Sequence, residues 1–454
     1  MATTIPTAPW YEQTRVYDAI RENLWIHFTQ MAEFKDADAR PTVIVRGEGS
    51  TIWDDQGNEL LDGLAGLYSV NAGYGRQEII DAMVAQLQQI PFVNGFAFAS
   101  VPAAVLADRL GELAPLGGNA RVFFTSGGSE AVESALKLAK QYQSNRGFNG
   151  RYKTISRRGA YHGTTMGALA VNGVTSIKGS FGPMVPGARH VEMSNAYRSD
   201  DDGYDAIERL VEFEGPESIA AIITEPVQNS GGCVPPASES YFHKIRKLCD
   251  ETGIVMIMDE VICGFGRTGQ WFGCQHFGFQ PDIMTIAKGL TSGYLPLGGV
   301  MFNDRIAGVL REQGGELAHG YTYSGHPVCA AVALENLRLL QSERVLERIR
   351  EDTGPYLADR WLALAEHPLV GEARIVGMVG ALELVADKAS RRYFDDRGRV
   401  GGLCRDLALR NGLILRATGD AMLLSPPLVI DRSQIDELVD KTRRTLDQTA
   451  AALG

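Results

Sequence analysis

Two residues with complementary chemistry follow short apolar runs in the middle of the sequence. Asp259 comes directly after the run 254–258, and Lys288 comes directly after the run 282–287. Short β-branched runs of this kind are typical of buried strands. Because ligands bind at the carboxyl ends of the strands in an open α/β sheet, we expect both side chains at one edge of the sheet.

A lysine and a carboxylate placed together can serve one particular organic cofactor. A buried lysine forms Schiff bases readily, and a buried carboxylate keeps a facing heteroaromatic nitrogen protonated. Pyridoxal 5'-phosphate (PLP) needs both groups, the lysine for its aldehyde and the acid for its pyridinium nitrogen. The alternative interpretation is a strand-end ion pair for Asp259 and a solvated Lys288. Other parts of the chain decide between these interpretations.

Length and composition describe an ordinary globular protein large enough for two domains. The 454 residues are 44% hydrophobic and 22% charged, with a formal net charge of −11. The chain has no run of basic residues, so neither nucleic acid nor an acidic membrane surface is an expected partner. No apolar run approaches the roughly 20 residues of a membrane span.

The cysteines are scattered and contain no CxxC pair, so we expect reduced thiols and no metal site. No signal peptide is visible at the N-terminus, and the expected location is the cytoplasm. The six cysteines are Cys233, Cys249, Cys263, Cys274, Cys329 and Cys404.

The first hundred residues are predicted to hold a helix, a small meander and a shaped loop. The helix covers 14–31, with Trp25 and Phe28 as apolar anchors, and the antiparallel meander covers 43–58. The glycine-rich stretch 63–75 is expected to be a loop. Clustered aromatic residues outside regular elements usually belong to the core, and we assign Phe92, Phe96 and Phe98 there.

From about residue 100 to 302, helical and strand patterns alternate, which indicates a mostly parallel sheet covered on both faces. A long helix is then predicted over 328–350, followed by mixed strands and helices without βαβ regularity. The predicted fold class is α/β, with a large domain at 70–328. A smaller α+β domain is expected at 329–454, completed by the N-terminal segment 1–69.

The stretch 125–130 is a glycine-rich junction between a strand and a helix. Backbone N–H groups at such a helix N-terminus, beside the hydroxyl of Ser129, can bind a phosphate. An ordinary turn with Ser129 as the N-cap is the alternative. Tyr161 follows another strand signal and could stack on a flat ring.

A second glycine motif, 264–269, fits the dinucleotide pattern G-x-G-x-x-G and follows a strand. A nucleotide-binding helix should open at its third glycine. The following stretch instead contains Gly273, Gly278 and Pro281, and no acid lies at the ribose distance. We therefore reject NAD binding at this motif.

Over nearly its whole length the sequence resembles the class III PLP-dependent aminotransferases, the ω-transaminases. The resemblance rests on 259–269 and 287–290, with support from 161–163 and 322–327. It implies a fold type I PLP transferase, a homodimer with active sites shared between subunits, and a tetramer as the alternative assembly. Two departures stand out: Gly127 replaces a serine that many relatives carry, and Tyr68 replaces a tryptophan.

The resemblance also implies a role for each site residue. Lys288 and Asp259 would be catalytic, and Arg416 would bind the substrate carboxylate. The implied cofactor-binding residues are Gly128, Ser129, Tyr161, Glu225, Asp259, Val261, Lys288 and, from the partner subunit, Thr322. The implied substrate-binding residues are Tyr68, Phe96, Tyr161, Ser230 and Arg416.

The implied activity is transfer of an amino group from an amine or ω-amino acid to a keto acid, with pyruvate expected, by a ping-pong mechanism through pyridoxamine phosphate. A PLP decarboxylase or aminomutase of the same fold is the alternative, an NAD-dependent dehydrogenase is more remote, and a non-catalytic PLP-binding protein is a third. The sequence leaves open the donor, which could be β-alanine, taurine, another ω-amino acid, a diamine or an arylalkyl amine. It also leaves 2-oxoglutarate open as the acceptor.

Overall fold

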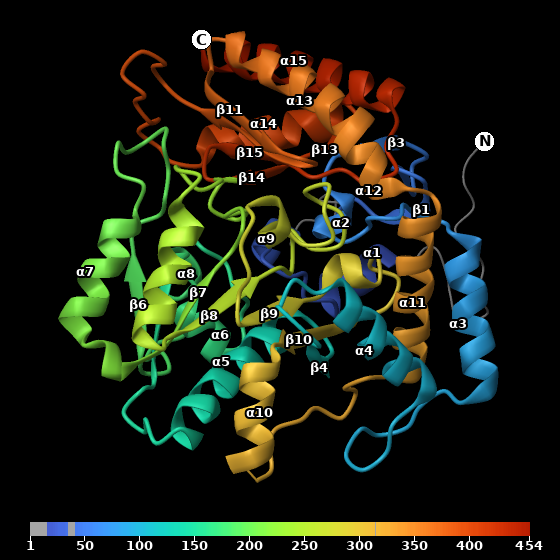
Figure 1. Cartoon of the computed structure of the whole chain (residues 1–454). Coiled ribbons are helices and arrows are strands. Elements are labelled where there is room, and N and C mark those ends of the chain that lie inside the picture. The colour runs from blue at the N-terminus through green and yellow to red at the C-terminus, as the bar shows by residue number, and fades with distance from the viewer. Residues whose placement is uncertain (1–15, 35–40, 314) are drawn as a thin grey trace.

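The computed structural model describes residues 16–34, 41–313 and 315–454, and it contains one large sheet and two smaller ones (Figure 1). The strands of the large sheet, in spatial order, are β4 (Arg121–Thr125), β10 (Gly298–Phe302), β9 (Ile283–Ile286), β8 (Val255–Asp259), β7 (Ile219–Thr224), β5 (Lys153–Arg157) and β6 (Ala188–Val191). β10 runs antiparallel to both of its neighbours, and all other adjacent strands of this sheet pair in parallel. The prediction of a mostly parallel sheet is confirmed.

Both faces of this sheet are buried, which explains why its central strands are largely apolar. Ile223 and Ile257 pack on one face with residues of α5 (Gly128–Asn145). Ile222 and Met256 point to the other face and pack in the cluster that includes α8 (Tyr241–Thr252). The remaining helices between residues 65 and 313 are α2 (Ala65–Tyr68), α3 (Gln77–Gln89), α4 (Val101–Leu113), α6 (Met166–Val171), α7 (Tyr204–Glu214), α9 (Gly273–His276) and α10 (Asp304–Gln313).

The two smaller sheets contain the N-terminal and C-terminal parts of the chain. The first is β1 (Ile44–Glu48), β2 (Thr51–Asp54), β3 (Glu59–Asp62) and β13 (Leu413–Ile414). The second is β11 (Val370–Val376), β12 (Val379–Leu384), β15 (Ala421–Leu424) and β14 (Arg416–Thr418). Because β13 pairs in parallel with β3, residues from both ends of the chain share one sheet. The domain limits at 69/70 and 328/329 stay predictions.

Five helices accompany these sheets after residue 326. They are α11 (Pro327–Ser342), α12 (Val345–Arg348), α13 (Gly354–Leu362), α14 (Arg399–Arg410) and α15 (Arg432–Leu453). In Figure 1, α13, α14 and α15 lie around the β11–β12–β15–β14 sheet, at the top of the molecule. Figure 1 also shows α3 and α11 side by side at the right-hand edge of the molecule.

Two of the predicted helices are wrong in extent. Within the described residues the first helix, α1, covers only Val16–Glu22. The helix predicted over 328–350 ends at Ser342, because Arg344 has φ 52°. Trp25 and Phe28 are 77% and 79% exposed, so they do not anchor this segment.

Candidate active site

The pocket that contains Lys288 and Asp259 has a volume of about 580 Å³ and lies at strand ends of the large sheet. Asp259 is the last residue of β8, and Lys288 follows β9 by two positions. Thr285 of β9 pairs with Asp259 in the register of the sheet. Adjacent strand ends therefore deliver an amine and a carboxylate to the same cavity.

Lys288 presents an amine without a fixed partner. Among the described residues its Nζ makes no ion pair or hydrogen bond, and it lies 5.4 Å from the centre of the Tyr68 ring. Removal from water lowers the pKa of Lys288 to about 8, although Asp259 acts to raise it. A substantial fraction of the amine is therefore neutral, and nucleophilic, near physiological pH. The residue has φ 48°, an unfavourable backbone conformation for a lysine.

Asp259 is buried and receives hydrogen bonds from three directions. His162 Nδ1 lies 2.7 Å from one carboxylate oxygen, and the Thr285 hydroxyl donates to the other oxygen at 2.9 Å. The backbone N–H of Val261 donates to that second oxygen at 3.2 Å. A carboxylate partner requires the proton of the imidazole on Nδ1. These donors stabilise the charged carboxylate and fix its orientation.

The first turn of α5 forms another side of the pocket and offers the backbone N–H groups of Gly128 and Ser129. The Ser129 hydroxyl accepts a hydrogen bond from Thr164 N at 3.1 Å, which ties the turn to the 161–164 segment. A Cβ at Gly128 would lie 3.1 Å from the Val261 side chain, so a larger residue at this position would have to displace Val261 slightly. The N-terminus of an 18-residue helix is well suited to bind a phosphate.

Glu225 lines the pocket and is buried. Its carboxyl group accepts hydrogen bonds from Tyr161 N at 3.3 Å and from Asn229 N at 3.2 Å. Burial raises the pKa of Glu225 to about 7, so the group can gain or lose a proton near neutral pH. Tyr161, Val261 and Ser230 also line this cavity.

Tyr68 and Arg416 provide unused polar groups in the same pocket. The Tyr68 hydroxyl is buried without a hydrogen-bond partner, and burial raises the pKa of Tyr68 while nearby Arg416 opposes the shift. Arg416 opens β14 and makes no ion pair among the described residues. A hydroxyl and an unpaired guanidinium group together suit a carboxylate ligand.

Thr322 and Phe96 lie outside the pocket of their own chain. Thr322 is exposed in a turn, and Phe96 is 68% exposed. A Cβ at Gly320 would lie 3.3 Å from the Phe96 ring, so Phe96 lies against the segment that leads to Thr322. The assignment of Phe92, Phe96 and Phe98 to the core is wrong, because all three are exposed, Phe92 by 38% and Phe98 by 63%.

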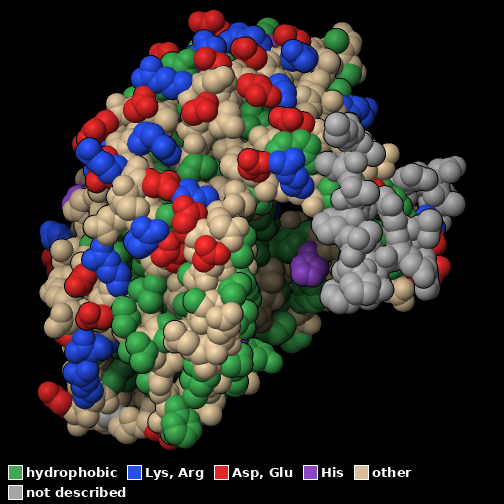
Figure 2. Space-filling model, turned by 90° about the vertical axis from the view of Figure 1, so that its right-hand side faces the viewer, with side chains coloured by type: hydrophobic (Ala, Val, Ile, Leu, Met, Phe, Trp, Pro, Cys, Tyr) green, Lys and Arg blue, Asp and Glu red, His purple; other side chains and the backbone are tan. Residues whose placement is uncertain are grey.

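These aromatic residues belong to a larger apolar surface, which we call the α3–α4 surface. Figure 2 shows apolar side chains gathered beside a hollow on this side of the molecule. The exposed residues that define the surface are Ile80, Val84, Leu87, Ile90, Phe92, Phe96, Phe98, Val101, Val105 and Tyr323. A surface of this kind marks a contact with another molecule.

Sequence reasoning did not assign several residues that the structure places in or beside this pocket. The sequence patterns assign no role to His162 or to Thr285. The strand register pairs Thr285 with Asp259, and a threonine inside the apolar run 282–287 was the available signal. His27 and Arg405 also line the pocket, and no local pattern marked either residue.

The rejected dinucleotide motif, 264–269, is not followed directly by a helix. No helix begins at Gly269, and the next helix, α9, begins at Gly273 and has four residues. Its first N–H groups, those of Gly273 and Cys274, already bind the carboxylate of Glu260 at 2.8 and 2.7 Å. A nucleotide phosphate therefore has no free helix N-terminus at this motif.

The chemical groups that line the pocket are of the types that PLP requires. Lys288 offers a free amine for the aldehyde, Asp259 an oriented carboxylate for the ring nitrogen, and the first turn of α5 an anion site without side-chain obstruction. The mostly parallel sheet and this set of donors define a PLP-dependent transferase of fold type I.

Comparison with known proteins then identifies the family. The model of the class-III aminotransferases matches residues 34–446, and the chain belongs to this family of PLP-dependent aminotransferases. A putrescine–pyruvate aminotransferase of Pseudomonas aeruginosa is 46% identical over 97% of this chain and 98% of its own length.

Two solved structures extend the comparison to the fold. An (S)-enantioselective ω-transaminase from Thermomicrobium roseum has a TM-score of 0.92 at 41% identity, over 97% of this chain and 99% of that one. The ω-transaminase of Pseudomonas jessenii in complex with PMP has a TM-score of 0.92 at 36% identity, over 96% of this chain and 98% of that one. The expected fold class, cofactor and aminotransferase activity are confirmed.

Proposed function

We propose that this aminotransferase moves an amino group from an amine or ω-amino acid donor to pyruvate. One structural observation carries the choice of a keto acid acceptor: Arg416 places an unpaired guanidinium group in the pocket that holds Lys288 and Asp259. A keto acid has a carboxylate that such a group can bind through two parallel hydrogen bonds. The putrescine–pyruvate relative supports pyruvate as the acceptor and puts a diamine among the candidate donors.

Lys288 has two roles in this proposal. It would hold the cofactor, and its Nζ would carry the proton that leaves the donor carbon. Its pKa of about 8 suits this role, because a group that must both accept and return a proton works best near the working pH. When bound, PLP supplies the electron-withdrawing ring that takes up the electron pair of the broken C–H bond.

Asp259 would keep the proton on the ring nitrogen of the cofactor. His162 and Thr285 hold the carboxylate in place, so its charge needs no reorganisation during the reaction. Tyr161 and Val261 would cover the two faces of the ring. Gly128, Ser129 and Thr322 of the partner subunit would bind the phosphate, and Glu225 would lie beside cofactor and substrate.

Tyr68, Ser230 and Arg416 would form the substrate side of the pocket, with Phe96 of the partner subunit. The unused Tyr68 hydroxyl and the Arg416 guanidinium group would share the carboxylate of the keto acid. For an apolar or cationic donor, Arg416 would have to turn away, because such a donor has no carboxylate for the guanidinium group to bind.

We infer that a homodimer is the working form. The α3–α4 surface is too apolar to face water, and Thr322 and Phe96 lie on or beside it and outside their own pocket. A second copy of the chain would cover this surface and bring both residues to the neighbouring site.

The cytoplasm is the proposed location. All six cysteines are buried and unpaired, as in proteins of a reducing compartment. Within the described ranges, no helix is both long and apolar enough to cross a membrane.

A panel of donors tests the proposal. The holoenzyme is mixed with each donor without acceptor, and conversion of bound PLP to pyridoxamine phosphate is followed by absorbance. Pyruvate or 2-oxoglutarate is then added, and alanine or glutamate is measured. Transamination predicts one alanine per ketone or aldehyde formed. Release of CO₂ without alanine would instead identify a decarboxylase, and glutamate in place of alanine would replace pyruvate with 2-oxoglutarate.

A further inference from the structure

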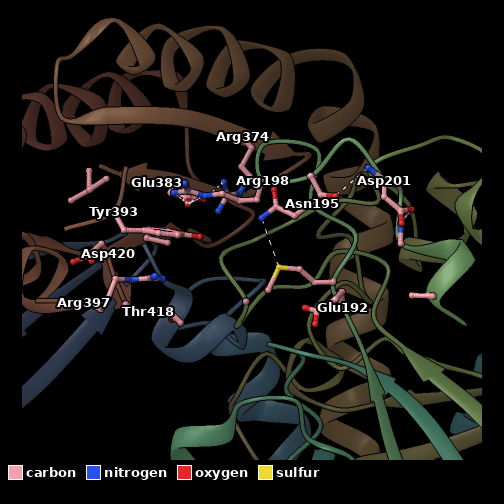
Figure 3. A pocket seen from close by; sticks show the side chains of 18 of the residues that line it. Glu192, Asn195, Arg198, Asp201, Arg374, Glu383, Tyr393, Arg397, Thr418 and Asp420 are labelled. Carbon is pink, nitrogen blue, oxygen red and sulfur yellow. Dashed lines mark hydrogen bonds and ion pairs between the residues drawn. The ribbon is translucent and has the colours of Figure 1, made fainter. Parts of the chain in front are cut away.

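A second cavity, of about 480 Å³, lies between the segment 192–203 after β6 and the β11–β12–β15–β14 sheet (Figure 3). It shares a wall with the active-site pocket. Gly231 lines the second cavity and Ser230 lines the first, whereas Thr418 lines both. A ligand in the second cavity would therefore contact the strand that begins with Arg416.

One part of the second cavity is a fixed, fully paired wall. The Arg374 guanidinium group donates to Glu383 at 2.8 Å and to Glu372, and Arg198 donates to Glu383 at 2.7 Å. Arg374 and Glu383 are buried. Because these charges satisfy one another, they shape the cavity and leave the recognition of a ligand to other groups.

An unpaired cation lies at one side of the cavity. Arg397 stacks over the Tyr393 ring at 3.5 Å, and Arg198 lies over the same ring at 3.7 Å. Within the described part of the chain Arg397 has neither an ion pair nor a hydrogen bond. The neighbouring carboxylate, Asp420, already accepts the N–H groups of Gly398 and Gly401 at 3.0 and 2.9 Å. The guanidinium N–H groups of Arg397 are therefore free for an anionic group.

Carboxylates lie at the opposite side. Figure 3 shows Asp201 and Glu192 across the cavity from Tyr393 and Arg397. One oxygen of Asp201 accepts Gly203 N at 2.8 Å, and the other has no partner among the described residues. Glu192 pairs with Arg158 at 2.7 Å, but both side chains are more than 60% exposed, so this ion pair is weak.

Asn195 stands between the two charged sides and is 7% exposed. Its amide nitrogen has only the sulfur of Met193 as partner, at 3.8 Å. A thioether is a poor acceptor, so this donor is almost unused. A buried polar group without a good partner needs an explanation. A bound ligand would provide it if one of its oxygen atoms accepted a hydrogen bond from the Asn195 amide.

We propose that this cavity is a binding site for a small zwitterion, namely an α- or ω-amino acid. The carboxylate would bind Arg397 and the Asn195 amide, and the ammonium group would bind Asp201 and Glu192. A simple anion or a simple cation would satisfy only one of the two sides. The volume is within the range of small-molecule sites, and such sites favour boundaries between packed units.

The test uses the holoenzyme reduced with borohydride, in which the cofactor is fixed to Lys288 and amino groups cannot react with it. Calorimetric titrations compare β-alanine and L-alanine with propylamine and propionate, which carry one charge each. We expect the zwitterions to bind at least tenfold more tightly than either singly charged compound. Arg397→Ala and Asp201→Asn should each weaken zwitterion binding at least tenfold, or about 1.4 kcal/mol.

Arg410→Ala is the matched control, because Arg410 is an exposed arginine at the other end of α14. It should bind like the unmodified protein. Unchanged binding in Arg397→Ala would place the amino acid in the active-site pocket and overturn the proposal. Equal affinity for propionate and β-alanine, or no binding of either zwitterion, would overturn it too. Both substituted residues are exposed, and melting curves verify that the variants are folded.

Discussion

His162 Nδ1 and Asp259 Oδ2 are 2.7 Å apart, and both side chains are buried. The other ring nitrogen, Nε2, is buried without a hydrogen-bond partner among the described residues. The imidazole therefore has one evident polar task, which is to orient the Asp259 carboxylate. We regard His162 as a positioning residue that acts on the cofactor through Asp259.

Replacing His162 by Phe should lower kcat by about 10- to 150-fold. The basis is the loss of a hydrogen bond to a charged group, which contributes about 1.5–3 kcal/mol. KM for the keto acid should change little, because His162 does not line the substrate side. His162→Asn, which keeps an N–H donor, should recover part of the rate.

Steady-state kinetics and a pH titration of the visible cofactor band check the His162 prediction. The midpoint of this titration should shift in His162→Phe, whereas a purely structural defect would leave the midpoint at its original pH. His243→Ala, at an exposed histidine of α8, is the control. A His162→Phe enzyme with unchanged kcat and an unchanged titration would show that Asp259 needs no such support.

The pH dependence of cofactor attachment should report the pKa of Lys288. Burial lowers this pKa from 10.5 to about 8, and only the neutral amine attacks an aldehyde. The rate of attachment to the apoenzyme should rise with pH and level off above about 8. Stopped-flow absorbance of the visible band measures it, and Lys288→Ala should give neither the band nor turnover. A rate that still rises tenfold between pH 9 and 10 would contradict the lowered pKa.

Arg416→Ala should divide substrates into two classes. Losing a bidentate charged pair costs about 1.5–3 kcal/mol, so KM for pyruvate and for carboxylated donors should rise about 10- to 150-fold. An uncharged amine needs no such contact, and its single-turnover rate should change little or improve. Stopped-flow measurement of the first half-reaction with both kinds of donor decides the matter. Equal losses for both would show that Arg416 supports the structure and not the substrate.

Thr322→Ala should weaken PLP retention, and the defect should be repaired by the other subunit. In a heterodimer of Lys288→Ala and Thr322→Ala chains, a shared site combines an intact lysine with an intact threonine. PLP affinity at that site should recover to the unmodified value, as measured by the visible band after subunit exchange. Failure to recover, with exchange verified by mass spectrometry, would place Thr322 in the site of its own subunit.

The large sheet could be predicted from sequence because its strands are buried on both faces. Such strands are nearly continuous apolar runs, and the runs 254–258 and 282–287 match β8 and β9 to within a residue at each end. The smaller elements carried weaker signals. Helices α7 and α8 were not predicted, although Gly215 and Gly253 directly follow them in the sequence.

Site residues were predictable where several of them share a short motif. Asp259 and Val261 belong to one such stretch, and Lys288 to another. The contact between His162 and Asp259 joins residues far apart in the chain, and only the order of strands brings them together. The exposed Phe92, Phe96 and Phe98 could not be assigned from one chain's pattern, because a subunit interface and a core have similar composition.

The left-handed backbone of Lys288 also bears on how sequence and stability are related at this site. Glycine or asparagine adopts φ 48° more easily than lysine, and such local strain costs about 1–3 kcal/mol. A search for the most stable sequence on this backbone would therefore discard the lysine. Stabilising redesign of this enzyme that ranks substitutions by folding free energy alone will select inactive proteins at position 288.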